Sequence, residues 1–137
     1  MIRWTIAACA AALVLSQTAI ADTRETQLKT LERYTPYLQA PVEQFQFWSL
    51  YKWQQAGPDN LVVWTTIKEA YLLTVEQPCS KLEWARAIGV TSQQNHYVTK
   101  RTDYVTADGD RCRITAIQPI DYARMQKENE GNAGAAK

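Results

Sequence analysis

Three side chains in this sequence, Asp103, His96 and Ser92, are of types that act together in hydrolases, where a histidine activates a hydroxyl group and a carboxylate orients the histidine. His96 is the only histidine and follows a run of polar residues, so we expect it to be an exposed loop residue. No nucleophile elbow or other recognised catalytic spacing accompanies the three residues. The sequence favours a non-catalytic protein, and a small hydrolase using Asp103 with His96 or Ser92 is the alternative.

Cys79 and Cys112 are the second chemical feature, and they lie 33 positions apart. In an oxidising compartment, a pair of thiols in a small domain favours a structural disulfide. A thioredoxin-like redox pair would be spaced C-x-x-C, and a zinc site would need two further ligands from a chain with one histidine. We expect a disulfide that stabilises the fold by roughly 3 to 4 kcal/mol.

The N-terminus indicates export. A basic start, an apolar run from Trp4 to Leu15, and Ala19 and Ala21 in A-x-A spacing are typical of a signal peptide over residues 1–21. The apolar run is shorter than the roughly 20 residues that span a bilayer, which argues against a membrane anchor. Lipid attachment at Cys9 is an alternative, although few apolar residues precede it. Cleavage before Asp22 predicts a periplasmic or secreted protein with no membrane span.

Composition excludes several classes of function. Without Arg3, the 14 remaining basic side chains balance the 14 acidic ones, so no electrostatic footprint for nucleic acid or anionic lipid is visible. The sequence contains no P-loop, dinucleotide fingerprint or paired-histidine motif. We therefore predict no cofactor, no metal and no nucleic-acid partner.

Aromatic residues are frequent after the signal segment. Trp48, Trp53 and Tyr51 fall within one extended stretch, where Trp48 faces the opposite side from the other two. Either the core needs these bulky rings, or one face presents them as a binding platform for a protein or a glycan. Trp48, Trp53 and Tyr51 are the predicted binding surface.

The remaining residues predict one domain over residues 22–128 and a disordered tail over 129–137. Strands are expected where aromatic and β-branched residues gather between turn signals: Phe45 to Gln54, Leu61 to Thr66, Ala70 to Glu76, His96 to Thr106 and Arg111 to Gln118. The first three should form an antiparallel meander. Helices are expected at three places: Asp22 to Tyr34, Lys81 to Ile88 with Gly89 ending it, and Asp121 to Glu128. An extended segment is the alternative to the second helix, and Pro119 should interrupt the last strand.

The dipeptide Asp108-Gly109 predicts a type I′ hairpin and thereby a register. Opposite pairs should be Ala107 with Asp110, Val105 with Cys112, Asp103 with Ile114, and Arg101 with Ala116. Because Cys112 and Ile114 face the core, Asp103 should point inward. A buried carboxylate needs backbone amide donors or a cation, with Arg101 and Arg86 as candidates.

The chain resembles a family of small exported bacterial proteins known only as a domain of unknown function. The resemblance covers about residues 47–121, and the segments that carry it are Leu61-Val62-Val63-Trp64-Thr65, Ala70-Tyr71-Leu72-Leu73, Pro78-Cys79, Ala87-Ile88-Gly89-Val90-Thr91-Ser92, Asp103-Tyr104-Val105, Arg111-Cys112-Arg113-Ile114 and Ile117-Gln118-Pro119-Ile120-Asp121. The family typically has arginine where this chain has Gln118. The resemblance implies an envelope location and the cysteine pair, and it implies no activity.

Together these observations predict an α+β fold, with a small curled antiparallel sheet of about five strands, an N-terminal helix and a short helix after Cys79. The predicted function is a non-catalytic periplasmic domain that binds a partner protein or an envelope component.

Overall fold

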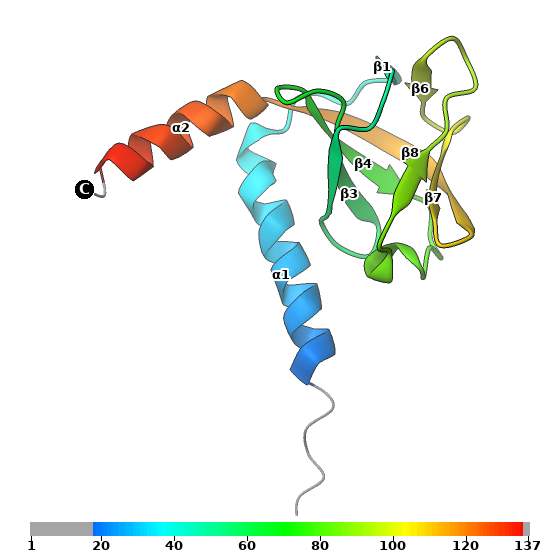
Figure 1. Ribbon diagram of the computed structural model, residues 1–137, viewed down its shortest axis with the longest axis horizontal. Helices are drawn as coiled ribbons and strands as arrows, with labels where there is room; N and C mark the ends of the chain where they lie inside the picture. Colours follow the sequence, from blue (N-terminus) through cyan, green and yellow to red (C-terminus); the bar gives the residue numbers. More distant parts are fainter. Residues whose placement is uncertain (1–17, 136–137) are drawn as a thin grey trace, which may run out of the picture.

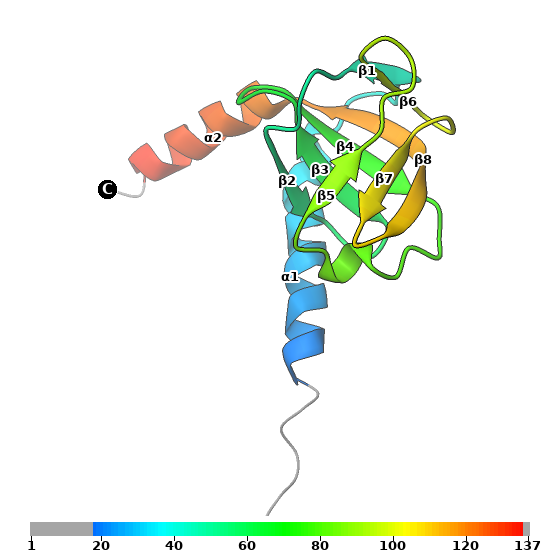
Figure 2. The same ribbon diagram turned by 45° about the vertical axis from the view of Figure 1, so that its right-hand side comes forward.

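The structure is a computed structural model that describes residues 18–135, with side chains from residue 24 to residue 131. Most of the predicted signal peptide therefore lies outside the described residues. The centre is a six-stranded antiparallel sheet in the order β2-β3-β4-β8-β7-β5, which curls around a core (Figures 1 and 2). Its strands are β2 (Lys52–Gln55), β3 (Asn60–Trp64), β4 (Ala70–Val75), β5 (Ile88–Val90), β7 (Tyr104–Ala107) and β8 (Asp110–Ile120).

A second, two-stranded sheet consists of β1 (Gln44–Gln46) and β6 (Tyr97–Thr99), and it sits at one end of the curled sheet (Figure 2). Phe45 and Val98 are paired in this ribbon and both are buried in the main core. Because side chains alternate along a strand, their neighbours in the ribbon face solvent. The ribbon thus closes the end of the core and presents an outward face.

Both faces of the main sheet are covered. The inner face contributes residues such as Leu61, Leu73 and Ile114 to the core inside the curl. The outer face contributes Val62 and Trp64 to a second cluster.

Helical segments cover that outer cluster, namely α1 (Thr18–Tyr34), the 3₁₀ turn η1 (Thr35–Tyr37) and the start of α2 (Tyr122–Ala135). Tyr34 packs edge-on against Trp64, with ring centres 6.0 Å apart, and its burial raises the pKa of the phenol. Beyond its first turns, α2 projects away from the sheet (Figure 1).

Several predictions are confirmed. The meander β2-β3-β4 forms, α1 ends at Tyr34, and the β7–β8 hairpin turns at Asp108 and Gly109, both with positive φ. Its register pairs Val105 with Cys112 and Ala107 with Asp110, as the turn type requires.

Two of the predicted strands are wrong in extent because each is divided between two sheets. Residues 45–54 hold β1 and β2, and residues 96–106 hold β6 and β7. The second break lies at Arg101, whose φ is 68° and whose N–H donates to the Ile114 carbonyl. The predicted pairing of Arg101 with Ala116 therefore does not form. The sheet has six strands rather than about five because residues 88–90 form β5 where the second helix was predicted to end.

The helix predicted over Lys81 to Ile88 is also wrong. One 3₁₀ turn, η2 (Leu82–Trp84), is followed by β5, which realises the extended alternative for this segment. Gly89 lies at the centre of β5 rather than at a helix end, paired with Thr106. Pairing of β5 with β7 thus outweighs the local capping signals that favour a helix.

The C-terminal part of the chain is more regular than expected. Pro119 does not interrupt β8, which runs to Ile120. Proline has no N–H to donate, but here it is needed only as an acceptor, since its carbonyl accepts the N–H of the neighbouring Gln39. Asp121 caps α2 by accepting the Arg124 N–H, as predicted. The segment predicted as a tail is helical as far as Ala135.

Candidate functional site

Asp103 is fully buried between β6 and β7, as the hairpin register predicts. One carboxylate oxygen accepts hydrogen bonds from the Thr91 hydroxyl (2.8 Å) and the Gln93 N–H (3.0 Å), and the other accepts from the Thr99 N–H (2.8 Å). Thr91 in turn accepts the Tyr104 N–H. The carboxylate therefore fastens the start of the loop between β5 and β6, and the last residue of β6, to the hairpin.

Backbone donors, rather than a cation, satisfy this buried charge. Arg101 and Arg86, the two cations considered from the sequence, are both exposed and neither contacts the carboxylate. Hydrogen bonds from two backbone amides and one hydroxyl replace the hydration that the carboxylate loses on burial. Asp103 is thus placed to position the loop that it holds.

The loop that Asp103 holds ends in a tight turn, in which Gln94 pairs with Tyr97. The two central residues, Asn95 and His96, have φ values of 39° and 63°, the left-handed backbone of a type I′ turn. Glycine adopts this conformation at no steric cost, whereas a histidine there costs on the order of 1 kcal/mol. The strained turn projects His96 outward from the end of β6.

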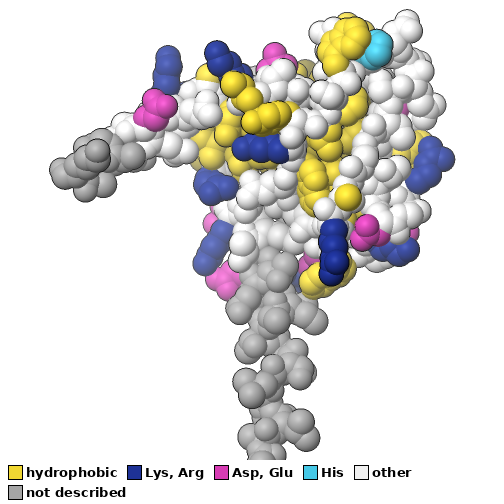
Figure 3. All heavy atoms as spheres, viewed as in Figure 1, with side chains coloured by type: hydrophobic (Ala, Val, Ile, Leu, Met, Phe, Trp, Pro, Cys, Tyr) yellow, Lys and Arg dark blue, Asp and Glu magenta, His cyan; other side chains and the backbone are white. Residues whose placement is uncertain are grey.

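His96 stacks on Trp48, with ring centres 4.0 Å apart and planes 21° from parallel. The two rings come from different segments, which the Phe47 N–H joins by donating to the His96 carbonyl. Figure 3 shows the histidine, in cyan, at one extremity of the molecule beside an exposed hydrophobic side chain. We call the exposed side chains of Trp48, His96 and Tyr97 the aromatic tip. Trp48 remains 68% exposed despite the stack.

The structure does not bring the three candidate catalytic residues together. His96 faces Trp48, and the Ser92 hydroxyl donates to the Tyr97 carbonyl. Neither side chain hydrogen-bonds to Asp103, whose carboxylate oxygens accept from Thr91, Gln93 and Thr99. The three residues are related through the loop between β5 and β6. Ser92 and His96 belong to this loop, and Asp103 anchors it.

The predicted aromatic surface is divided. Trp48 and Tyr51 are exposed, whereas Trp53 is half-buried and packs against the core. Tyr97 was not predicted from the sequence and joins Trp48 and His96 at the tip. The sequence did contain a signal for this surface. The two segments that form the tip, residues 44–51 and 91–99, contain aromatic residues and no Asp, Glu, Lys or Arg.

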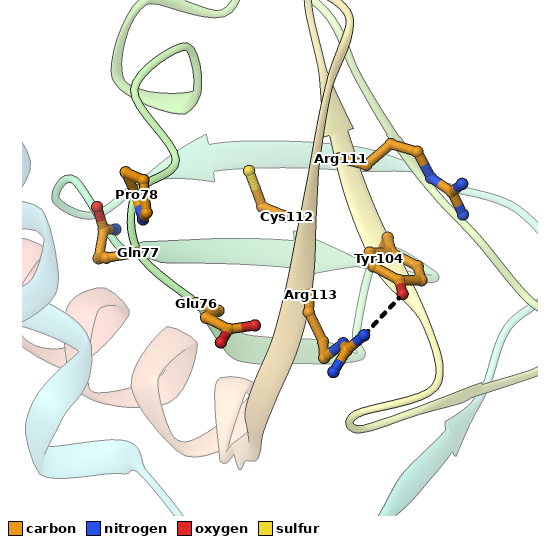
Figure 4. Close-up of a pocket in the computed structure, with 7 residues that line it drawn as sticks. All are labelled: Glu76, Gln77, Pro78, Tyr104, Arg111, Cys112 and Arg113. Atoms are coloured by element: carbon orange, nitrogen blue, oxygen red, sulfur yellow. Dashed lines mark hydrogen bonds between the residues drawn. The ribbon is translucent and has the colours of Figure 1, made fainter.

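A separate shallow pocket of about 280 Å³ lies beside Cys112 (Figure 4). The Arg113 guanidinium donates to the Tyr104 hydroxyl (3.1 Å), which raises the pKa of Arg113, and Arg111 lies over the same ring. Glu76 lines the pocket as well and offsets part of the positive charge. We interpret these contacts as side-chain packing between β7 and β8, and the net charge of the pocket is small.

The part of the chain that the structure describes lacks two further features. Over residues 18–135, no helix is both long enough and apolar enough to cross a membrane. Those residues also hold no group of three or more histidine, cysteine or acidic side chains that could bind a metal ion.

Comparison with known proteins identifies the family of the chain. A family model described as "Family of unknown function (DUF6491)" matches residues 1–136. The chain belongs to this family. No curated protein and no solved structure matches it.

The disulfide expected from the cysteine pair is present, since Cys79 and Cys112 are bonded with Cα atoms 5.8 Å apart.

Proposed function

We propose that this member of the family is an exported, non-catalytic domain that binds a component of the cell envelope through the aromatic tip. The observation that carries the proposal is the exposed stack of Trp48 on His96 at the end of the molecule. A large aromatic side chain that stays exposed in a folded domain is a common feature of binding surfaces, because its burial by a partner releases much apolar area from water.

The support beneath the tip favours binding. The buried carboxylate of Asp103 holds the loop in position through hydrogen bonds. The ribbon of β1 and β6 pairs the segment that carries Trp48 with the segment that carries His96. A surface held in place before binding loses less side-chain entropy when a partner docks. Export is supported by the signal pattern of the N-terminal sequence and by the disulfide, which persists in oxidising compartments.

The test compares three forms of the purified chain on isolated cell envelopes. Wild type should co-sediment with envelopes, and Trp48→Ala should reduce retention roughly tenfold, since an aromatic contact contributes about 1 kcal/mol or more. Trp84→Ala is the matched control, because Trp84 is also exposed (51%) but lies in η2, away from the tip. Equal retention of wild type and Trp48→Ala would contradict the proposal, as would no retention of either.

A further inference from the structure

We propose that the aromatic tip binds an uncharged glycan, with Trp48 stacking on the apolar face of a sugar ring. This inference rests on the proposed function and names the chemistry of the ligand. It depends on three observations: an open aromatic face, free amide groups beside a second ring, and the absence of Asp, Glu, Lys and Arg from the segments that form the tip.

The open face belongs to Trp48. His96 covers one side of the indole, yet the residue is 68% exposed, so the opposite side is free to receive a ligand. A pyranose ring has a face of C–H groups that matches a flat aromatic surface in size and polarity. The imidazole behind the indole fixes the angle of the ring and thereby the plane in which a sugar would stack.

The amide groups lie on either side of Tyr97. Gln46 is paired with Tyr97 across the β1–β6 ribbon, and Gln94 is paired with it across the turn. Directly opposed residues share a face, so the ring lies between the two amides on the outward side. The side chains of Gln46 and Gln94 are exposed and make no hydrogen bond to any described residue. Each amide offers a donor and an acceptor, the combination that sugar hydroxyl groups require.

Charge decides between ligand classes. Residues 44–51 and 91–99, which form the tip, contain no Asp, Glu, Lys or Arg. Three charged residues flank these segments: Lys100 is ion-paired with Glu43 at 3.0 Å, and the ammonium group of Lys52 lies over the rings of Trp64 and Tyr122 in the outer cluster. A surface without lysine or arginine offers few cations to acidic glycans, nucleic acids or anionic lipids, and a surface without Asp, Glu, Lys or Arg has few ions to desolvate when a neutral ligand binds. An uncharged polyhydroxyl compound is the class that fits rings and amides alone.

The strained turn supports the same inference. His96 occupies a left-handed position where glycine would cost less, and the residue that stands there supplies the ring that backs Trp48. Strain of this kind is found at functional sites, where it is retained for what the side chain does.

The experiment measures binding of the full chain to neutral oligosaccharides of glucose and of N-acetylglucosamine, with an acidic oligogalacturonate for comparison. Intrinsic tryptophan fluorescence and NMR chemical-shift mapping report the binding. We expect at least one neutral oligosaccharide to bind and the acidic one not to bind. Trp48→Ala should weaken binding roughly tenfold, and Trp84→Ala should leave it unchanged.

A second variant keeps the turn while removing the stack. His96→Gly places the preferred residue in the left-handed position, so the fold should be retained, and glycan binding should fall severalfold because the indole loses its support. Full glycan affinity in His96→Gly would overturn the role assigned to the stack.

The two proposals fail separately. If the chain binds envelopes through Trp48 but binds no neutral oligosaccharide, or prefers the acidic one, the glycan inference is wrong and the binding function stands. If neutral oligosaccharides bind and also displace the chain from envelopes, both are supported. If neither envelopes nor oligosaccharides bind, both are overturned.

Discussion

At the scale of single residues, Asp103 shows how a buried charge can serve positioning. Its two oxygens accept three hydrogen bonds, two of them from backbone amides, at Gln93 in the loop between β5 and β6 and at Thr99 in β6. Such bonds to a charged acceptor are stronger than those to a neutral one, and removing them leaves the donors buried without partners. The loop that carries His96 therefore depends on this one side chain.

We expect Asp103→Asn to lower the free energy of unfolding by about 2 to 3 kcal/mol. The amide keeps the shape of the side chain but turns one acceptor into a donor, which then faces a donor from the loop. Urea denaturation followed by circular dichroism measures the loss. Asp108→Asn is the control, since Asp108 is exposed with φ of 47° and asparagine tolerates that backbone. An Asp103→Asn protein as stable as wild type would refute the anchoring role.

At the scale of elements, β5 depends on a close approach of two strands. Gly89 is paired with Thr106 of β7, and a Cβ atom at Gly89 would lie 2.6 Å from the Thr106 Oγ1. That distance is shorter than any normal contact, so a side chain at position 89 must displace β5 or Thr106. The glycine therefore serves the packing of an edge strand, and β5 leads directly into the loop that Asp103 holds.

Gly89→Ala should destabilise the protein by about 1 to 3 kcal/mol, the usual effect of overpacking. Adding Thr106→Ala removes the oxygen that the new methyl group meets and should restore much of the loss. A double-mutant cycle of unfolding free energies measures this coupling. If Thr106→Ala gives no recovery, the steric explanation for Gly89 is incorrect.

At the scale of the whole molecule, the disulfide joins the segment after β4 to the beginning of β8. Cys79 and Cys112 are both buried in the main core. A crosslink over 33 positions restricts the unfolded chain and so favours the folded state, and a domain of this size has modest stability without such a constraint.

Reduction should lower the free energy of unfolding by roughly 3 to 4 kcal/mol. The measurement is urea denaturation with and without dithiothreitol, beside the variant with Cys79→Ala and Cys112→Ala. Reductant should leave that variant unchanged, and the reduced wild type should approach its stability. A wild type that is equally stable in both conditions would show that the crosslink contributes little.

The sequence by itself determined the features that depend on neighbouring residues. Asp108-Gly109 specified a turn, the turn specified the register of β7 and β8, and the register placed Asp103 inside and Val105 opposite Cys112. Backbone conformation at a two-residue turn is set locally, which is why this chain of inference held over several residues.

Only the tertiary structure decided what pairs across distance. Residues 45–54 have the composition of one strand, yet they divide between two sheets, because β1 meets β6 and β2 meets β3. The capping signal after Cys79 competed with pairing to β7, and pairing prevailed. Trp48 and His96 lie far apart in the chain, so their stack could not be predicted from either segment alone. Such contacts arise from the free energy of packing the whole domain, which local sequence patterns do not contain.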